Sequence, residues 1–217
     1  MTPSQSSDAI INLERVKEIC AENMEKLLQH HIQYDLGETQ RNSKPNSLFI
    51  ISPKKVQPNT KPFALTMEVW NQTCAPQAGK RTASILEAWG DLYGGDMNFA
   101  PTISEFNIVL DTHAKCSSGD YDSYTKDSYP AELAWELYSI LSSLDDPTLL
   151  PNIASCSHIV HALSNHAFVM RYAKKTFETQ MDSEIAAIRA YFIWKRMVDM
   201  INDKKEITHD ELELAWR

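Results

Sequence analysis

Apolar residues recur at three- and four-residue steps along most of the chain, the spacing that places side chains on one face of an α-helix. Phe63, Met67, Trp70 and Cys74 are the clearest example. Alternation typical of a β-strand occurs only in the short run SLFII at 47–51. The pattern therefore predicts an all-α fold.

Three segments open alike, with a proline, a small polar residue and then an amphipathic helix pattern. They begin at Pro58-Asn59, Pro101-Thr102 and Pro151-Asn152, and the units that follow start at positions 60, 103 and 153. Successive starts lie 43 and 50 residues apart, a period that indicates stacked repeats. A second amphipathic pattern follows within each unit, at 80–93, 130–144 and 184–201. Because a single helix hairpin cannot bury both of its apolar faces, the repeats predict an α-solenoid of stacked helix–turn–helix units.

The same pattern divides the chain into six segments. The first, 1–36, is a long helix that fits half of a leading repeat, with core contacts expected at Ile11, Val16, Ile19, Met24, Leu27 and Leu28. A connector at 37–59 contains Gly37, Pro45, Pro53 and Pro58. The remaining segments are a repeat at 60–102, a repeat at 103–152 with a polar loop insert at 117–129, a repeat with an insert at 153–205, and a capping or truncated helix at 206–217.

Local signals mark where some of these helices begin. Thr102 and Glu105 stand three residues apart, as in a capping box, and Pro130 suits the first helical turn because its missing N–H costs nothing there. The run AGKRT at 78–82 resembles a phosphate loop, but Cys74 and Arg81 replace the glycine and the hydroxyl residue that such a loop needs. We interpret Gly79-Lys80 as a turn before the second helix.

Charge and cysteine spacing exclude several classes of protein. The net charge is −8, and residues 87–146 hold twelve acidic and two basic residues. A uniformly basic surface is therefore absent, so we expect no DNA binding through phosphate contacts. The four cysteines form no close pair, which excludes a zinc knuckle and a redox CxxC motif. His158 and His161 share a helix, but a zinc site needs further ligands. No apolar run is long enough to span a bilayer.

Several segments resemble the pentatricopeptide-repeat family. PTISEFNIVLDTHAK (101–115) is similar to that family's first helix, with its aromatic-Asn pair at Phe106-Asn107. RTASILEAWGDLY (81–93), AWELYSIL (134–141) and AYFIWKRM (190–197) are similar to its second helix. The resemblance covers about 60–205 and implies a non-catalytic array that binds single-stranded RNA along its first helices. It also implies a role in RNA processing, stability or translation in a mitochondrion or plastid.

The resemblance further implies which side chains contact RNA. One base-reading residue follows the aromatic of the first helix, and the other ends the unit. The candidates are Ala64 with Thr102, Asn107 with Asn152, Ser157, and Lys61 as a phosphate contact. Asn side chains can both donate and accept hydrogen bonds at a base edge, whereas Ala64 cannot. Neither a cofactor nor a metal is expected, and Trp89 and Trp194 fall on predicted core faces.

A second interpretation remains open: a helical-repeat scaffold that binds proteins and not RNA. The net charge of −8 favours it, as do Lys61, Ser104 and Ala154 at positions where the family carries an aliphatic residue that packs against a base. Under both interpretations the protein is not an enzyme, because no catalytic set can be argued from the order of its residues. Protein partners are expected in the second case and single-stranded RNA in the first.

Overall fold

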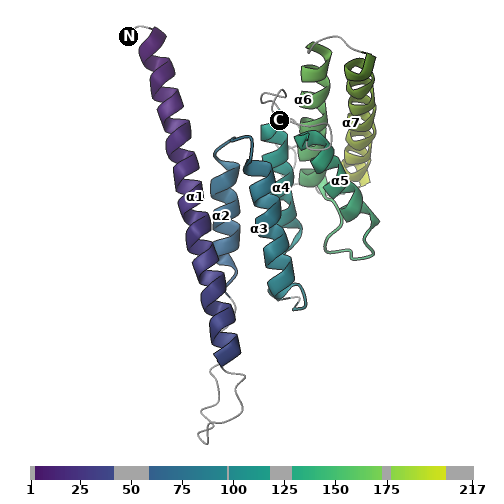
Figure 1. The fold of residues 1–217 in the computed structure, drawn as a ribbon. Coiled ribbons are helices and arrows are strands. Elements are labelled where there is room, and N and C mark those ends of the chain that lie inside the picture. The colour runs from purple at the N-terminus through teal and green to yellow at the C-terminus, as the bar shows by residue number, and fades with distance from the viewer. Residues whose placement is uncertain (1–2, 42–58, 97, 118–128, 173–176, 204–217) are drawn as a thin grey trace, which may run out of the picture.

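The computed structural model describes residues 3–41, 59–96, 98–117, 129–172 and 177–203 (Figure 1). Within these ranges the chain forms seven α-helices and no strand. The predicted all-α fold is therefore confirmed. SLFII, most of the connector, nearly all of the polar loop insert and the 206–217 segment lie outside the described residues.

The helices follow the predicted order of amphipathic segments. α1 continues to Arg41, past the expected start of the connector, so Gly37 lies within the helix. An isolated glycine costs a helix only about 1 kcal/mol, whereas proline costs about 3. The bounds are α1 Pro3–Arg41, α2 Lys61–Asn71, α3 Ala78–Tyr93, α4 Ile103–Cys116, α5 Pro130–Ser143, α6 Ile153–Tyr172 and α7 Phe177–Asp203.

The helices lie side by side and pack mainly on their neighbours in the sequence (Figure 1). α2 packs on α3, α4 on α5 and α6 on α7, so each pair forms a hairpin. The first helices also pack on each other, α2 on α4 and α4 on α6, while α3 packs on α4 and α5 on α6. α1 packs on α2 at one edge of the row. The first helices α2, α4 and α6 thus form a continuous series.

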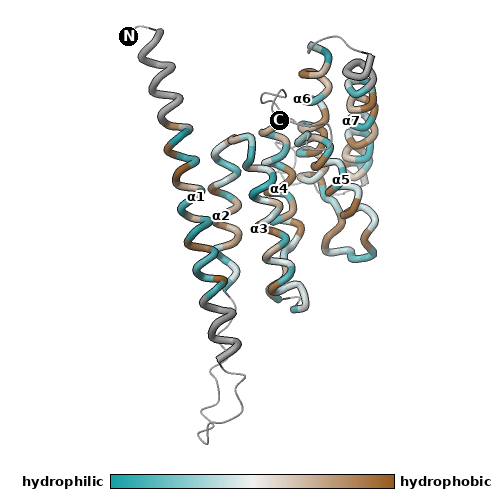
Figure 2. Tube along the Cα trace, viewed as in Figure 1, coloured by the Kyte–Doolittle hydropathy of each residue, from teal (hydrophilic) through white to brown (hydrophobic). Residues whose placement is uncertain are grey.

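Two buried clusters hold this row together, and α4 contributes to both. Val109 belongs to the cluster of α1 to α4, and Leu110 belongs to the cluster of α4 to α7. Both side chains are fully buried, and each such burial stabilises the fold by about 1.5–3 kcal/mol. Teal and brown alternate along the coloured parts of the helices in Figure 2, as expected for helices with one buried and one exposed face.

The core contacts predicted for α1 are only partly right. Leu28 is buried, but Val16, Ile19 and Leu27 are exposed, Leu27 by 64%. The buried side of α1 instead runs through Ala21 and Leu28, which are seven residues apart and so share a helical face. The exposed apolar residues lie on other faces, because α2 is the helix that packs extensively on α1.

Trp89 is buried as predicted, but the prediction for Trp194 is wrong. Trp194 is 48% exposed, while Ala190, Ile193 and Met197 supply the buried face of α7. Successive residues of a helix are rotated by about 100°, so Trp194, which follows Ile193, points away from the buried face of α7.

The interpretation of Gly79-Lys80 as a turn before the second helix is also wrong, because α3 already begins at Ala78. Gly79 is buried in the first turn of α3. A side chain added there would lie 2.5 Å from Nδ1 of His113 on α4. This glycine therefore permits the close approach of α3 and α4.

Candidate nucleic-acid interface on the first helices

A polar stripe runs along α4 between its neighbours α2 and α6. Asn107, Asp111 and Lys115 follow one another at four-residue steps, which places them on one face of the helix. All three side chains are half-buried and bonded to residues of other helices or helix starts. The stripe therefore joins the three first helices through polar contacts.

The first contact group brings together two predicted base-reading residues from successive units. Asn107 Nδ2 donates to Asn152 Oδ1 at 3.3 Å. The hydroxyl of Ser155, at the start of α6, donates to Asn107 Oδ1 at 2.7 Å. Ser155 is fully buried, whereas Asn152 is exposed. A buried hydroxyl, that of Ser155, thus holds the Asn107 amide in place, and Asn107 in turn is bonded to Asn152, which is exposed to solvent.

The second contact group centres on Asp111 and connects all three first helices. Its Oδ2 accepts from Asn71 Nδ2 of α2 at 2.8 Å and lies 2.7 Å from Lys115 Nζ. Its Oδ1 lies 3.4 Å from His158 Nδ1 of α6. Burial alone would raise the pKa of Asp111, but hydrogen bonds from His158, Lys115 and Asn71 outweigh burial and hold the pKa below its usual range. The carboxylate is therefore ionised and well satisfied.

Thr102 and Ala64 are placed less favourably for reading a base. The Thr102 hydroxyl donates to Glu105 Oε2 at 2.6 Å, and Glu105 also accepts from the Thr102 backbone N–H at 2.8 Å. The predicted capping box is therefore present. Ala64 is half-buried against the first core cluster. Thr102 supplies the one polar side-chain group of this pair, and its hydroxyl is already engaged in the capping box of α4.

The two remaining candidates lie on the first helices. Lys61 is exposed at the start of α2, and its backbone N–H is bonded to the side chain of Asn59 at 3.3 Å. Ser157 is half-buried on α6, next to His158. Lys61 is an exposed cation on the outermost of the three first helices, and Ser157 is adjacent in sequence to His158 of the Asp111 group.

Four residues of this surface were missed by sequence reasoning. Asp111 and Lys115 continue the four-residue spacing from Asn107, so the stripe itself was a usable signal. Ser155 stands three residues after Asn152, and their backbone and side-chain groups exchange hydrogen bonds of 3.0 and 3.1 Å. Asn71 carried no signal, because its role depends on how closely α2 approaches α4.

The described residues show no group of three or more side chains that could hold a metal ion. No helix in the described part of the chain is long and apolar enough to cross a membrane. In comparisons with known proteins, no family model, no curated protein and no solved structure matches this chain.

Proposed function

We propose that this chain is a single-stranded RNA-binding protein of pentatricopeptide type, acting in organellar RNA processing, stability or translation. In this proposal the hairpins form an α-solenoid, and α2, α4 and α6 line the face that binds RNA. The observation that carries it is the 3.3 Å contact between Asn107 and Asn152, which come from successive units. Two amides from neighbouring hairpins, held together, form a pair that can address one base.

A base that binds this pair must break the hydrogen bond between the two amides and form its own bonds to them. Asn107 Nδ2 and Asn152 Oδ1 supply one donor and one acceptor to each other. A base edge that takes over both roles exchanges one neutral hydrogen bond for two, and each is worth about 1 kcal/mol net. Ser155 keeps Asn107 oriented during the exchange.

Charge around the pair predicts modest affinity. Lys115 is bound to Asp111, which leaves Lys61 as the exposed candidate for a phosphate contact. The affinity for a single strand falls with salt with a slope of about −0.7 for each phosphate contact. We therefore expect a shallow salt dependence, with base contacts supplying most of the selectivity.

The test is binding to a pool of single-stranded RNAs at moderate salt, followed by the double substitution Asn107→Ala/Asn152→Ala. We expect the double variant to lose about tenfold in affinity for its selected RNA, equivalent to about 1.4 kcal/mol. Asn98→Ala is the matched control, because Asn98 is an exposed amide in the connection before α4 and outside the polar stripe. Absence of binding to every pool member would refute the proposal.

A protein-interaction scaffold is the second proposal, and the exposed side of α7 favours it. Ile188, Tyr191 and Phe192 are all exposed, Phe192 by 62%. Contiguous apolar surface of this kind marks interaction sites on soluble proteins. Partners captured by the protein should remain bound after nuclease digestion. Loss of all partners on digestion would eliminate this proposal and support RNA as the bridge.

A further inference from the structure

A groove lies over α4, between the second helices α3 and α5. It encloses about 410 Å³, and its floor is formed by Val109 and His113 of α4. Leu137 and Ile140 line the α5 wall, and Ala83 lines the α3 wall. Sites that bind ligands in proteins typically measure about 300–1,000 Å³. The groove is therefore large enough to take side chains of a partner.

One residue of the floor is a buried histidine whose hydrogen-bonding capacity is not fully used. His113 is only 4% exposed, and within the described residues its Nδ1 has no hydrogen-bond partner. Burial lowers the pKa of His113 to about 4, so the ring is neutral at pH 7. A polar atom left unpaired in the interior costs about 1–3 kcal/mol. The unpaired Nδ1 lies buried beside Gly79 of α3 and is not open to the groove. Because the ring is neutral, the floor is uncharged at pH 7.

The rims of the groove carry acidic side chains. Glu87 on α3 and Glu136 on α5 line it and are exposed, with Lys80 as the basic residue of the rim. Neither carboxylate has an ion-pair partner in the part of the chain that the structure describes. Exposed carboxylates that flank an apolar floor match a partner with basic residues beside an apolar stripe.

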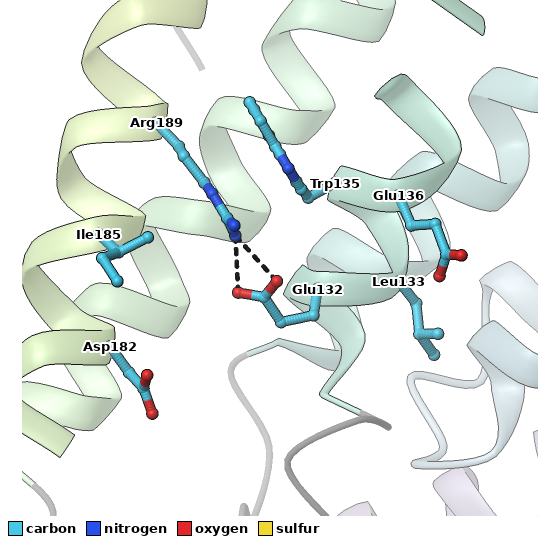
Figure 3. Close-up of a pocket in the computed structure, with 7 residues that line it drawn as sticks. All are labelled: Glu132, Leu133, Trp135, Glu136, Asp182, Ile185 and Arg189. Atoms are coloured by element: carbon cyan, nitrogen blue, oxygen red, sulfur yellow. Dashed lines mark hydrogen bonds and ion pairs between the residues drawn. The ribbon is translucent and has the colours of Figure 1, made fainter. Parts of the chain in front are cut away.

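A second groove, of about 440 Å³, lies on the other side of α5 and shares Leu133 and Glu136 with the first. Here Arg189 of α7 donates to both carboxylate oxygens of Glu132 at 2.8 Å and lies 4.7 Å from the ring of Trp135. Figure 3 shows Leu133 and Glu136 on the side of α5 away from Arg189. In the second groove, Glu132 and Trp135 are therefore already bound by Arg189, whereas the carboxylates at the rim of the first groove have no such cation bound to them among the described residues.

We propose that the groove between α3 and α5 binds an amphipathic helix of a protein partner, with apolar side chains on the floor and Lys or Arg on both flanks. Helices that bind grooves use apolar anchors at i, i+3, i+4 and i+7, and the exposed Ile140 and half-buried Leu137 offer them a contact surface. The inference rests on the second proposed function and adds to the exposed side of α7 a second surface, with a stated partner chemistry. It does not require RNA binding, since the polar stripe and this groove involve different residues.

The test is selection of a displayed library of random peptides on the whole chain. We expect the enriched peptides to share helical apolar spacing with flanking Lys or Arg. Synthetic copies are then titrated by fluorescence anisotropy against Ile140→Asp and Glu136→Lys. Both residues are exposed, Ile140 by 52%, so circular dichroism should show that these variants keep their helices.

Two matched controls separate the groove from general surface effects. Asp91→Lys makes the same charge reversal on an exposed residue of α3 outside the groove, and Leu27→Asp makes the same apolar replacement on an exposed residue of α1. We expect about tenfold weaker binding for the groove variants only. Absence of basic amphipathic peptides among those enriched, or equal binding by groove and control variants, would overturn the inference. If the inference is overturned but captured partners remain bound after nuclease digestion, the scaffold function stands and only its assignment to this groove is wrong.

Discussion

Replacing Gly79 with alanine should destabilise the protein, although alanine is the better helix former. An alanine Cβ at this position would lie 2.5 Å from Nδ1 and 2.7 Å from Cε1 of His113. The imidazole is buried, so it cannot swing into solvent to make room. Overpacking of this kind typically costs about 1–3 kcal/mol. The gain in helix propensity is below its full value of about 1 kcal/mol, because Gly79 lies in the first turn. We expect a net loss of about 1–2 kcal/mol.

Gly90 in the same helix is the matched control for this substitution. An added Cβ at Gly90 meets nothing within 4 Å, so Gly90→Ala should gain about 0.5–1 kcal/mol from propensity alone. Urea denaturation of both variants, followed by tryptophan fluorescence, measures the difference. For a chain of this size, 1 kcal/mol corresponds to about 2–4 °C in Tm. If Gly79→Ala stabilises the protein as much as Gly90→Ala does, the close packing of α3 on α4 is refuted.

The other two predictions concern the start of α4 and the response to acid. Thr102→Ala removes the side-chain half of the capping box and should lower the free energy of unfolding by about 1 kcal/mol in urea titrations; an unchanged midpoint would contradict that cap. The pKa of His113 falls from 6.5 to about 4 on burial, so the unfolded chain binds the proton more readily, and stability present above pH 6.5 is lost as pH falls toward 4. The loss approaches roughly 3 kcal/mol. In His113→Leu, the free energy of unfolding should depend less on pH between pH 7 and 4.5. His166 should contribute to the slope that remains, because burial also lowers its pKa. If the free energies of unfolding of the two proteins fall in parallel with pH, His113 is not the cause of the acid sensitivity.

The order and type of the helices were predictable from the sequence, because apolar spacing records which side of a helix is buried. The pattern does not record how much of an apolar surface its neighbours cover. Val16 and Leu27 are as apolar as Leu28, yet only Leu28 is covered by the neighbouring helices. Trp194 shows the same limit. It was predicted to lie on the buried face of its helix, but that face passes through the preceding residue, Ile193, and Trp194 is exposed.

The polar surface was predictable only in part. Asn107 and Asn152 were chosen from the family resemblance, and the structure places them in contact. The network around Asp111 was not foreseen, because it joins Asn71 to residues about forty positions away and needs the spacing between helices to be known. Gly79 was misread as part of a turn, because the need for a small residue comes from His113 on the next hairpin.

Packing between near neighbours also determines how this chain can assemble. The helix pairs that pack extensively are adjacent in the sequence or separated by one helix. Because each hairpin packs chiefly on its neighbours, folding can nucleate in any hairpin and spread to the next. Hydrogen exchange should therefore reveal separate opening events for the two sides of α4, and damage to one hairpin should leave distant amides protected.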